Sequence, residues 1–291
     1  MTAEYIDGKA VAEAVRAEVA VGVDAHLSAT GRRPGLATLL IGDDPASEVY
    51  VRNKRRLCRD VGMADRHQHL PGDVSQRAVE ETIDALAADT SVSGILLQLP
   101  APPHLDAEEL VGRIPAGKDV DGLTIWNAGL LAQNREGLRP CTPSGVMRLL
   151  DHAAVQIAGA HAVVVGRSAL VGRPMAQMLT NRDATVTVCH SRTVDLEAVC
   201  KTADILVVAA GRPRMLDADA VKPGAVVIDV GIHRTADGLC GDVDTDSASR
   251  VASMITPVPG GVGPMTIAML LENTLIAEKA TANALIANAA D

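Results

Sequence analysis

The chain of 291 residues is poor in aromatic side chains: it contains no phenylalanine, one tryptophan and two tyrosines. Proteins that bind single-stranded nucleic acid stack bases on aromatic rings, so this scarcity excludes such a platform. The 36 acidic side chains outnumber the 27 basic ones, and the net charge of −9 disfavours binding to a phosphate backbone. We therefore expect a small-molecule ligand and no nucleic-acid partner.

Long apolar runs are also missing. The longest, such as Ile205–Ala210, have the length of a strand and fall far short of the roughly 18 residues that a membrane span needs. The first seven residues carry acidic groups where a secretory signal would carry basic ones. These features predict a cytoplasmic protein with no membrane partner.

Cysteine is sparse, with five residues scattered along the chain. Their spacing matches neither a C-x-x-C motif nor a zinc site, so reduced thiols are expected. His67 and His69 lie two apart on an expected strand, but no third ligand is evident in the sequence. We expect no metal site.

Apolar residues make up 47% of the chain, and its length suggests two domains. Helical patterns alternate with short apolar runs in both halves, which is typical of an α/β fold. In the second half, the strand spacing predicts a Rossmann-like, doubly wound parallel sheet. The expected strands are Gly35–Ile41, Gly94–Leu99, His161–Val165, Ala184–Cys189, Asp204–Ala209 and Ala225–Val230.

The domain boundary is expected at the sequence R-P-C-T-P, because Thr142 can cap a helix and Pro143 can occupy its first position. This places a first, catalytic α/β domain at residues 1–140 and a nucleotide-binding domain at residues 141–264. The alanine-rich helix expected over residues 265–291 would pack back on the first domain.

A lysine occupies the apolar face of the helix expected over Ser47–Val61. At about 100° per residue, Lys54 shares that face with Tyr50, while four arginines point the opposite way. Its ammonium must extend into solvent, pair with an acid, or lie desolvated with a lowered pKa. A lysine with a lowered pKa can move protons near neutral pH.

Two more polar groups are candidates for the same site. Gln98 follows an expected parallel strand, where open α/β sheets place ligand groups, although such an amide can also bond only to its own loop. Asp119 and Asp121 lie two apart in the sequence G-K-D-V-D-G. One of these carboxylates could pair with Lys54 or accept hydrogen bonds from the N–H groups of a heterocycle. The alternative is that the motif only forms a turn.

A glycine-bounded turn follows the strand His161–Val165 and leads into a helix. Glycines let the backbone approach a pyrophosphate, and the helix N-terminus offers free N–H groups. The spacing departs from G-x-G-x-x-G, so an ordinary turn is the alternative. The next strand ends in H-S-R, where Ser191 and Arg192, joined by Arg167, suit a ribose 2′-phosphate. These residues predict NADP over NAD, unless they are merely surface groups.

Six motifs in this order resemble the bifunctional methylenetetrahydrofolate dehydrogenase/methenyltetrahydrofolate cyclohydrolase family, and they span nearly the whole chain. The motifs are Y-V-R-N-K (50–54), Q-L-P (98–100), K-D-V-D-G (118–122), P-C-T-P (140–143), G-R-S-x-x-V-G-R-P (166–174) and P-V-P-G-G-V-G-P-M-T (257–266).

The resemblance implies a cytosolic homodimer that oxidises 5,10-methylenetetrahydrofolate with NADP and hydrolyses the methenyl product to 10-formyltetrahydrofolate. It places the enzyme in one-carbon metabolism and purine biosynthesis, with the active site in a cleft between two α/β domains.

The resemblance also implies residue roles. Lys54 would be the principal catalytic residue, and Tyr50 would pack against the folate rings. Gln98 would tune the lysine, and Asp121 would bind the amino edge of the pterin. The implied cofactor residues are Gly166, Arg167, Ser168, Ser191, Arg192 and Ile232. The implied folate-binding residues are Tyr50, Lys54, Leu97, Gln98, Leu99, Asp121, Pro259, Gly260, Gly261 and Gly263.

Three positions depart from the family's usual pattern, at Ala101–Pro102, Leu123–Ile125 and His233. Two alternatives stay open at this point. One is an NADP-dependent dehydrogenase of another small acid, similar to shikimate dehydrogenases, and activity on shikimate would favour it. The other is a non-catalytic folate or nucleotide sensor, which a lack of turnover would favour.

Overall fold

The computed structural model describes residues 2–236 and 238–290. The chain forms two compact units, each named here for its parallel sheet. The three-stranded unit comprises Ala14–Cys141 and Ile267–Asp291, and the six-stranded unit comprises Met1–Glu13 and Thr142–Thr266. Among the helices of the described residues, none combines the length and apolar character that a membrane span requires.

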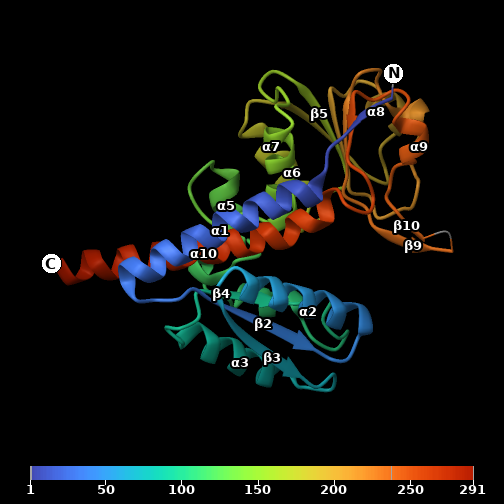
Figure 1. Ribbon diagram of the computed structural model, residues 1–291. Coiled ribbons are helices and arrows are strands. Elements are labelled where there is room, and N and C mark those ends of the chain that lie inside the picture. The colour runs from blue at the N-terminus through green and yellow to red at the C-terminus, as the bar shows by residue number, and fades with distance from the viewer. Residues whose placement is uncertain (1, 237, 291) are drawn as a thin grey trace. The chain divides into compact units, whose positions relative to one another are not determined.

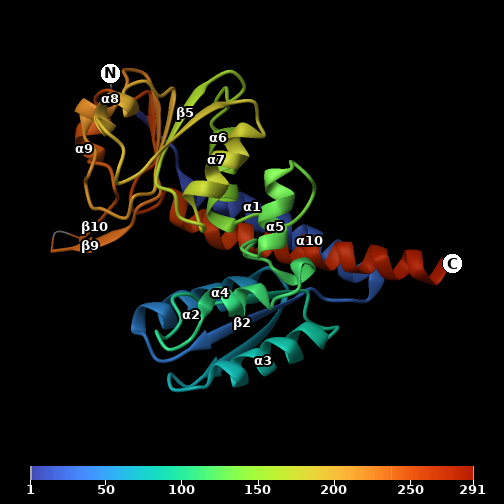
Figure 2. The same ribbon diagram turned by 180° about the vertical axis from the view of Figure 1, so that it is seen from behind.

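The sheet of the three-stranded unit has the order β3-β2-β4, and both pairings are parallel. Its strands are β2 (Gly35–Ile41), β3 (Ala64–Leu70) and β4 (Gly94–Leu97). Apolar side chains of β2 and β4 share a buried core with α3 (Gln76–Ala88) and α4 (Ala107–Gly112). Helix α2 (Pro45–Asp60) lies on the other face of the sheet from α3 (Figures 1 and 2). The remaining short elements of this unit are η1 (Ala116–Lys118) and α5 (Ile125–Ala132).

Helix α2 carries Lys54 and begins earlier than expected. The Asp44 carboxylate accepts from the Ser47 N–H at 2.8 Å. Pro45 occupies the first turn, where a backbone N–H would have no partner within the helix, so proline costs no hydrogen bond there. This capping fixes where α2 begins, and Lys54 lies on the buried face of the helix.

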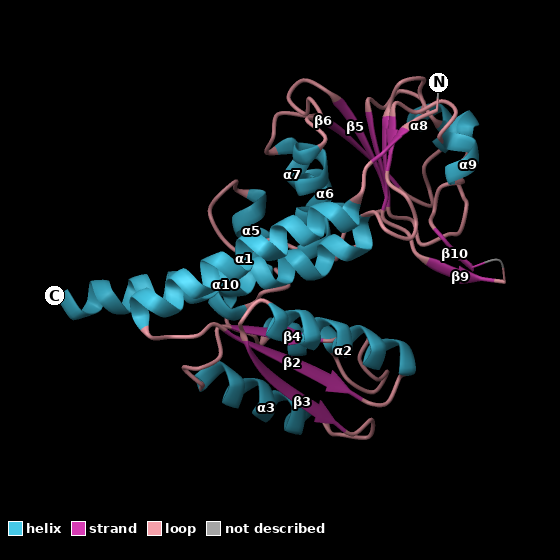
Figure 3. Ribbon diagram, in the orientation of Figure 1, coloured by secondary structure: helices cyan, strands magenta, loops and turns pink. Residues whose placement is uncertain are grey.

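The two long helices, α1 (Gly8–Thr30) and α10 (Val262–Ala290), lie side by side (Figure 3). Within the three-stranded unit they are joined at Glu278, a carboxylate with 2% of its side chain exposed. It accepts from Arg32 Nε at 2.8 Å, from Ser93 Oγ at 2.8 Å and from His26 Nε2 at 3.3 Å. The last residue of the helix expected over 265–291 lies outside the described residues.

The six-stranded sheet has the order β1-β11-β8-β7-β5-β6 and is parallel throughout. Strands β6 and β7 flank β5, so the chain reverses direction across the sheet at β5. This topology confirms the predicted doubly wound, Rossmann-like α/β fold. The strands are β1 (Glu4–Tyr5), β5 (His161–Val165), β6 (Thr185–Cys189), β7 (Ile205–Val208), β8 (Val226–Asp229) and β11 (Met254–Ile255).

Short helices and a hairpin complete this unit. The helices are α6 (Cys141–His152, whose first residue belongs to the other unit), α7 (Gly172–Thr180), α8 (Leu196–Cys200), η2 (Ala218–Ala220) and α9 (Thr245–Ala248). The antiparallel hairpin consists of β9 (His233–Thr235) and β10 (Gly238–Cys240).

Two expectations about the boundaries are corrected. Residues 1–13 belong to the six-stranded unit rather than to the first domain, because β1 pairs with β11. Helix α6 begins at Cys141, so Thr142 is not its cap and Pro143 is not its first residue. Both lie within its first turn, where a proline costs no helical hydrogen bond.

Candidate active site

Lys54 is buried in the three-stranded unit, with 6% of its surface exposed. Its Nζ atom donates to Gln98 Oε1 at 3.0 Å and lies 5.0 Å from the centre of the Tyr50 ring. Desolvation lowers the pKa of Lys54, although the nearby charge of Asp121 opposes the shift. Of the three possibilities left by the sequence, the structure supports the desolvated amine with a lowered pKa.

Gln98 follows directly after β4, as its position in the sequence predicts. Its Nε2 donates to Leu99 O at 2.6 Å, which leaves Oε1 directed at Lys54. An amide oxygen accepts from an ammonium without adding a negative charge, so Gln98 orients Lys54 without strongly favouring its protonated form.

The two aspartates of the K-D-V-D-G motif have different environments. Asp119 is buried and accepts from Leu123 N, Thr124 N and Asn127 Nδ2 at 2.8–3.1 Å, so it organises the start of α5. Asp121 is the residue whose charge acts on Lys54. Desolvation raises the pKa of Asp121, while Lys54 and the Cys141 thiol oppose that shift.

Two residues at this site were missed by the sequence reasoning. The Cys141 thiol is fully buried beside Asp121, and its Sγ donates to Val120 O at 3.3 Å. Burial, followed by the charge of Asp121, raises the pKa of Cys141 well above its ordinary value. Asn273 of α10 donates to Val120 O and Arg139 O, both at 2.8 Å. Two sequence features could have drawn attention to them. Cys141 lies within P-C-T-P, and Asn273 is an amide inside the mostly apolar run A-M-L-L-E-N-T-L-I-A.

A cavity of about 350 Å³ opens at the carboxyl ends of β5, β6 and β7 in the six-stranded unit. It contains no acidic side chain, and Arg167, His190 and Arg212 are among its polar groups. Its lining residues are Val165, Gly166, Arg167, Ser168, His190, Ser191, Thr193, Leu196, Ala209, Ala210, Arg212 and Met215. Four of the six predicted cofactor residues therefore meet here. Arg192 and Ile232 are not among the lining residues, and Ile232 is 61% exposed.

Gly166 lets the chain after β5 pack directly against the chain after β7 at the wall of this cavity. Its φ is +130°, and a Cβ atom there would lie 2.2 Å from Ala209 O. Only glycine fits this position. In the adjoining turn, Ser168 Oγ accepts from Val171 N and Gly172 N at the start of α7.

The wall formed by Ala210 and Arg212 is held by a buried acid. Asp242 accepts from the N–H groups of Ala210, Gly211 and Arg212 at 2.6–3.0 Å. The Oδ1 atom of Asp242 also lies 2.7 Å from His233 Nε2, so His233 contacts the carboxylate that holds this wall. Neither residue was among the predicted cofactor residues.

Other predicted residues are placed as follows. Leu97 is 3% exposed and belongs to the core of β4, so its side chain is buried away from any ligand. Pro259, Gly260, Gly261 and Gly263 lie in the six-stranded unit, in the turn before α10 and in its first residues. There the Gly261 N–H donates to Pro257 O at 2.8 Å.

Among the described residues, no three His, Cys, Asp or Glu side chains are arranged to hold a metal ion. His67 Nδ1 lies 2.9 Å from Thr38 Oγ1, and His69 Nε2 lies 3.0 Å from Gly42 O. Both histidines are thus engaged with neighbouring strand and loop atoms.

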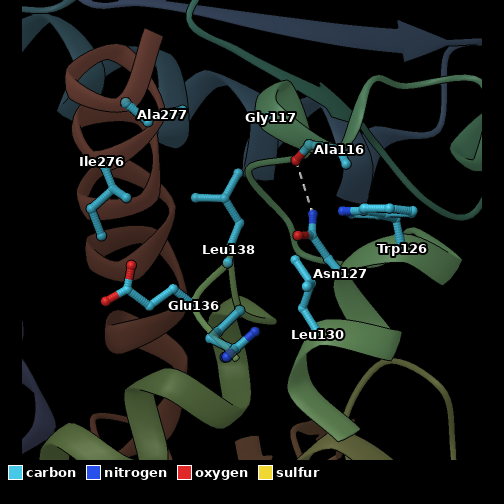
Figure 4. Close-up of a pocket in the computed structure, with 12 residues that line it drawn as sticks. Ala116, Gly117, Trp126, Asn127, Leu130, Glu136, Leu138, Ile276 and Ala277 are labelled. Carbon is cyan, nitrogen blue, oxygen red and sulfur yellow. Dashed lines mark hydrogen bonds between the residues drawn. The ribbon is translucent and has the colours of Figure 1, made fainter. Parts of the chain in front are cut away.

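A cavity of about 510 Å³ lies elsewhere, between α5, α10 and residues 136–139 (Figure 4). Its wall is mostly apolar, and it holds neither Lys54 nor Asp121. In Figure 4, Asn127 reaches from α5 to Ala116, whose carbonyl accepts from Asn127 Nδ2 at 3.0 Å. Since neither Lys54 nor Asp121 lines this cavity, we do not assign the predicted chemistry to it.

Comparison with known proteins gives matches along nearly the whole chain. Residues 6–121 match the tetrahydrofolate dehydrogenase/cyclohydrolase catalytic domain, and residues 140–282 match the NAD(P)-binding domain of the same family. The chain is 64% identical over 282 residues to Bifunctional protein FolD 2 of Frankia alni, covering 97% of this chain and 98% of that protein. It is 55% identical over 284 residues to Bifunctional protein FolD of Bordetella bronchiseptica, covering 97% and 100%.

Solved structures give the same result. The FolD methylenetetrahydrofolate dehydrogenase/cyclohydrolase from Campylobacter jejuni superimposes with a TM-score of 0.93 at 44% identity, covering 95% of this chain and 99% of that chain. The Trypanosoma brucei enzyme, solved with NADP cofactor and inhibitor, also gives a TM-score of 0.93, at 41% identity, covering 97% and 99%.

Proposed function

The chain belongs to the tetrahydrofolate dehydrogenase/cyclohydrolase family, and from this premise we propose its function. It is a bifunctional enzyme that oxidises 5,10-methylenetetrahydrofolate with NADP and then hydrolyses 5,10-methenyltetrahydrofolate to 10-formyltetrahydrofolate. The observation that carries this function is the buried Lys54, which is hydrogen-bonded to Gln98 and lies within the field of Asp121. We assign the folate to the three-stranded unit and NADP to the six-stranded unit.

The cavity of the six-stranded unit fits NADP. Gly166 presents backbone without a side chain at the cavity wall, Arg167 and Arg212 supply positive charge, and Ser191 supplies a hydroxyl just after β6. We keep Ser168, Arg192 and Ile232 as further contacts predicted by the resemblance. When bound, NADP would supply the nicotinamide carbon that accepts the hydride.

Lys54 acts in the hydrolytic step. Water adds to the bridging carbon between N5 and N10, and the neutral Lys54 amine accepts the proton that this water loses. The resulting ammonium then donates a proton to N5 as the bond from N5 to carbon breaks, and the hydroxyl proton leaves to solvent. A lowered pKa suits both transfers, because it increases the share of neutral amine that can accept a proton, and the ammonium formed then gives its proton up more readily.

The remaining polar groups orient the substrate. The Asp121 carboxylate accepts from the amino edge of the pterin, and the Tyr50 ring, 43% exposed, packs against the folate rings. Leu99, Pro259, Gly260, Gly261 and Gly263 remain predicted contacts. For Leu97 only backbone contact is proposed, since its side chain is in the core.

We also propose that the enzyme is a cytoplasmic homodimer whose 10-formyl product serves purine biosynthesis. Five free, buried cysteines support a reducing compartment. Gel filtration with light scattering tests the homodimer.

An absorbance assay tests the function itself. With 5,10-methylenetetrahydrofolate and NADP, the methenyl species should appear and then decay to the 10-formyl product. Formation without enzyme-dependent decay would leave only the dehydrogenase activity. If the methenyl species neither forms nor decays, the proposal is contradicted. Shikimate with NADP serves as the control substrate and should give no turnover.

A further inference from the structure

Asn273 is a buried amide of α10 that joins two separate chain segments of the three-stranded unit. It is 4% exposed, and its Nδ2 atom donates to Val120 O and to Arg139 O, both at 2.8 Å. The same nitrogen lies 3.7 Å from Cys141 Sγ. One segment carries Asp121 and the other carries Cys141, so a single amide group reaches the backbone beside each of them.

The two segments are in close contact where Asn273 joins them. Gly122 has a φ of +68°, and a Cβ atom there would lie 2.4 Å from the Arg139 carbonyl carbon. The Cys141 Sγ donates to Val120 O at 3.3 Å, which adds a second link between the segments. The placement of Asp121 is therefore set by the contact between residues 120–122 and 139–141, and Asn273 holds that contact from the side of α10.

We propose that Asn273 is a positioning residue for the hydrolytic step, which holds the Asp121 backbone so that the carboxylate stays beside Lys54. This inference rests on the function proposed above for Lys54 and Asp121. It differs from a role in stability alone, because it predicts a change in the titration of Lys54, to which Asn273 makes no hydrogen bond in the described structure.

The direction of that change follows from the groups around Lys54. Asp121 and Cys141 both favour its charged form, Gln98 and the Tyr50 ring add no formal charge, and burial favours the neutral amine. When Asp121 moves away, Lys54 loses the negative charge that acts on it most strongly. Its pKa then falls below the wild-type value, and the rising limb of the hydrolysis pH profile moves to lower pH.

The variants are Asn273→Ala and the milder Asn273→Ser, whose short hydroxyl cannot reach both carbonyls. Thr274→Ala is the matched control, because Thr274 is also buried on α10 and its hydroxyl donates to Leu270 O of its own helix. Asp121→Asn provides the reference for loss of the charge. The Lys54 resonance is followed by NMR of ¹³C-lysine-labelled protein and is assigned from its absence in Lys54→Arg.

We expect Asn273→Ala to lower the Lys54 pKa by about one unit, in the direction of Asp121→Asn. Methenyl hydrolysis should fall about 10- to 100-fold in kcat, as expected when a group near the reaction is misplaced. The double variant Asn273→Ala/Asp121→Asn should be no slower than Asp121→Asn alone, because both changes remove one interaction. Thr274→Ala should leave the titration and the rate at wild-type values.

An Asn273 variant that only lowers the melting temperature, with the Lys54 titration and the rate unchanged, would overturn the proposal. If Asn273→Ala does not fold, Asn273→Ser decides by the same two readouts. Failure of the proposed function is distinguishable, since wild-type enzyme would then not hydrolyse the methenyl substrate, while the NMR titrations would still decide whether Asn273 positions Asp121.

Discussion

The Nζ atom of Lys54 donates to the Oε1 atom of Gln98 across 3.0 Å, and the Nε2 atom of the same amide donates to Leu99 O. The second bond fixes the first, because turning the amide over would direct its N–H groups at an ammonium. The lysine is thus held by a neutral acceptor in a desolvated position.

Gln98→Glu should therefore raise the pKa of Lys54. A carboxylate at hydrogen-bond distance favours the ammonium, so the rising limb of hydrolysis should move to higher pH by about one to three units. The rate at pH 7 should fall at least about 10-fold and recover on raising the pH. A fall in rate that no pH restores would show that Gln98 has another role. The pH profile of kcat, measured beside Gln98→Asn, is the test.

Gly166→Ala should weaken NADP binding without harming hydrolysis. The added Cβ would meet the Ala209 carbonyl at 2.2 Å, in a backbone conformation that alanine rarely adopts. The affinity for NADP, measured by calorimetry, should fall at least about 10-fold, at a cost of about 1.4 kcal/mol or more. Gly159→Ala is the control, since Gly159 also has a positive φ but open space around it. Equal losses in both variants would mean that backbone strain, and not the phosphate cradle, is responsible.

Ser191→Asp should reverse the cofactor preference. Ser191 lines the cavity just beyond β6, where enzymes that use NAD place an acid for the ribose hydroxyl. A carboxylate there would repel a 2′-phosphate, so we expect KM for NADP to rise about 10- to 100-fold while KM for NAD stays constant or falls. Ser191→Ala separates loss of the hydroxyl from added charge. Unchanged discrimination in Ser191→Asp would place the 2′-phosphate elsewhere.

Glu278→Ala should destabilise the three-stranded unit. It leaves Arg32, His26 and Ser93 without their shared acceptor, and breaking such a buried pair costs about 3 to 5 kcal/mol. Arg32 is about one-third exposed and can regain water, so we expect the lower end, about 3 kcal/mol, in urea unfolding. Lys279→Ala, an exposed neighbour, should cost much less.

Glu278 also predicts a pH dependence. Burial alone would raise the pKa of Glu278, but hydrogen bonds from Arg32 and Ser93 outweigh it, so the pKa lies below the ordinary 4.5. The contribution of this carboxylate to stability is complete above pH 4.5 and is lost as the pH falls through the folded-state pKa. The stability difference between wild type and Glu278→Gln should shrink below pH 4.5, and a constant difference from pH 7 to pH 3 would contradict this.

The parts of the site that depend on local pattern were predictable from the sequence. Helical periodicity placed Lys54 on the buried face of α2, and the rule that ligand groups follow parallel strands drew attention to Gln98. Glycines with a strand before them and a helix after them indicated the tight turn at Gly166, whose role in phosphate binding stays a prediction.

Features that depend on distant contacts were not predictable. Asn273 and Val120 are 153 positions apart, so periodicity cannot reveal that they meet. Strands β1 and β11 have two residues each, too few to show an alternating pattern, and their pairing moved residues 1–13 to the other unit. Asp119 and Asp121 are equivalent in the sequence, and only the turn that directs Asp119 toward Thr124 distinguishes them.

Lys54→Met provides the most direct measurement of the central claim, because it removes the proton-transferring amine and retains an unbranched, mostly apolar side chain. Single-turnover decay of 5,10-methenyltetrahydrofolate should slow about 100- to 10,000-fold, as expected for loss of a general acid–base group, while calorimetric NADP binding stays at wild-type affinity. Methenyl decay at the wild-type rate in folded Lys54→Met enzyme would contradict the account.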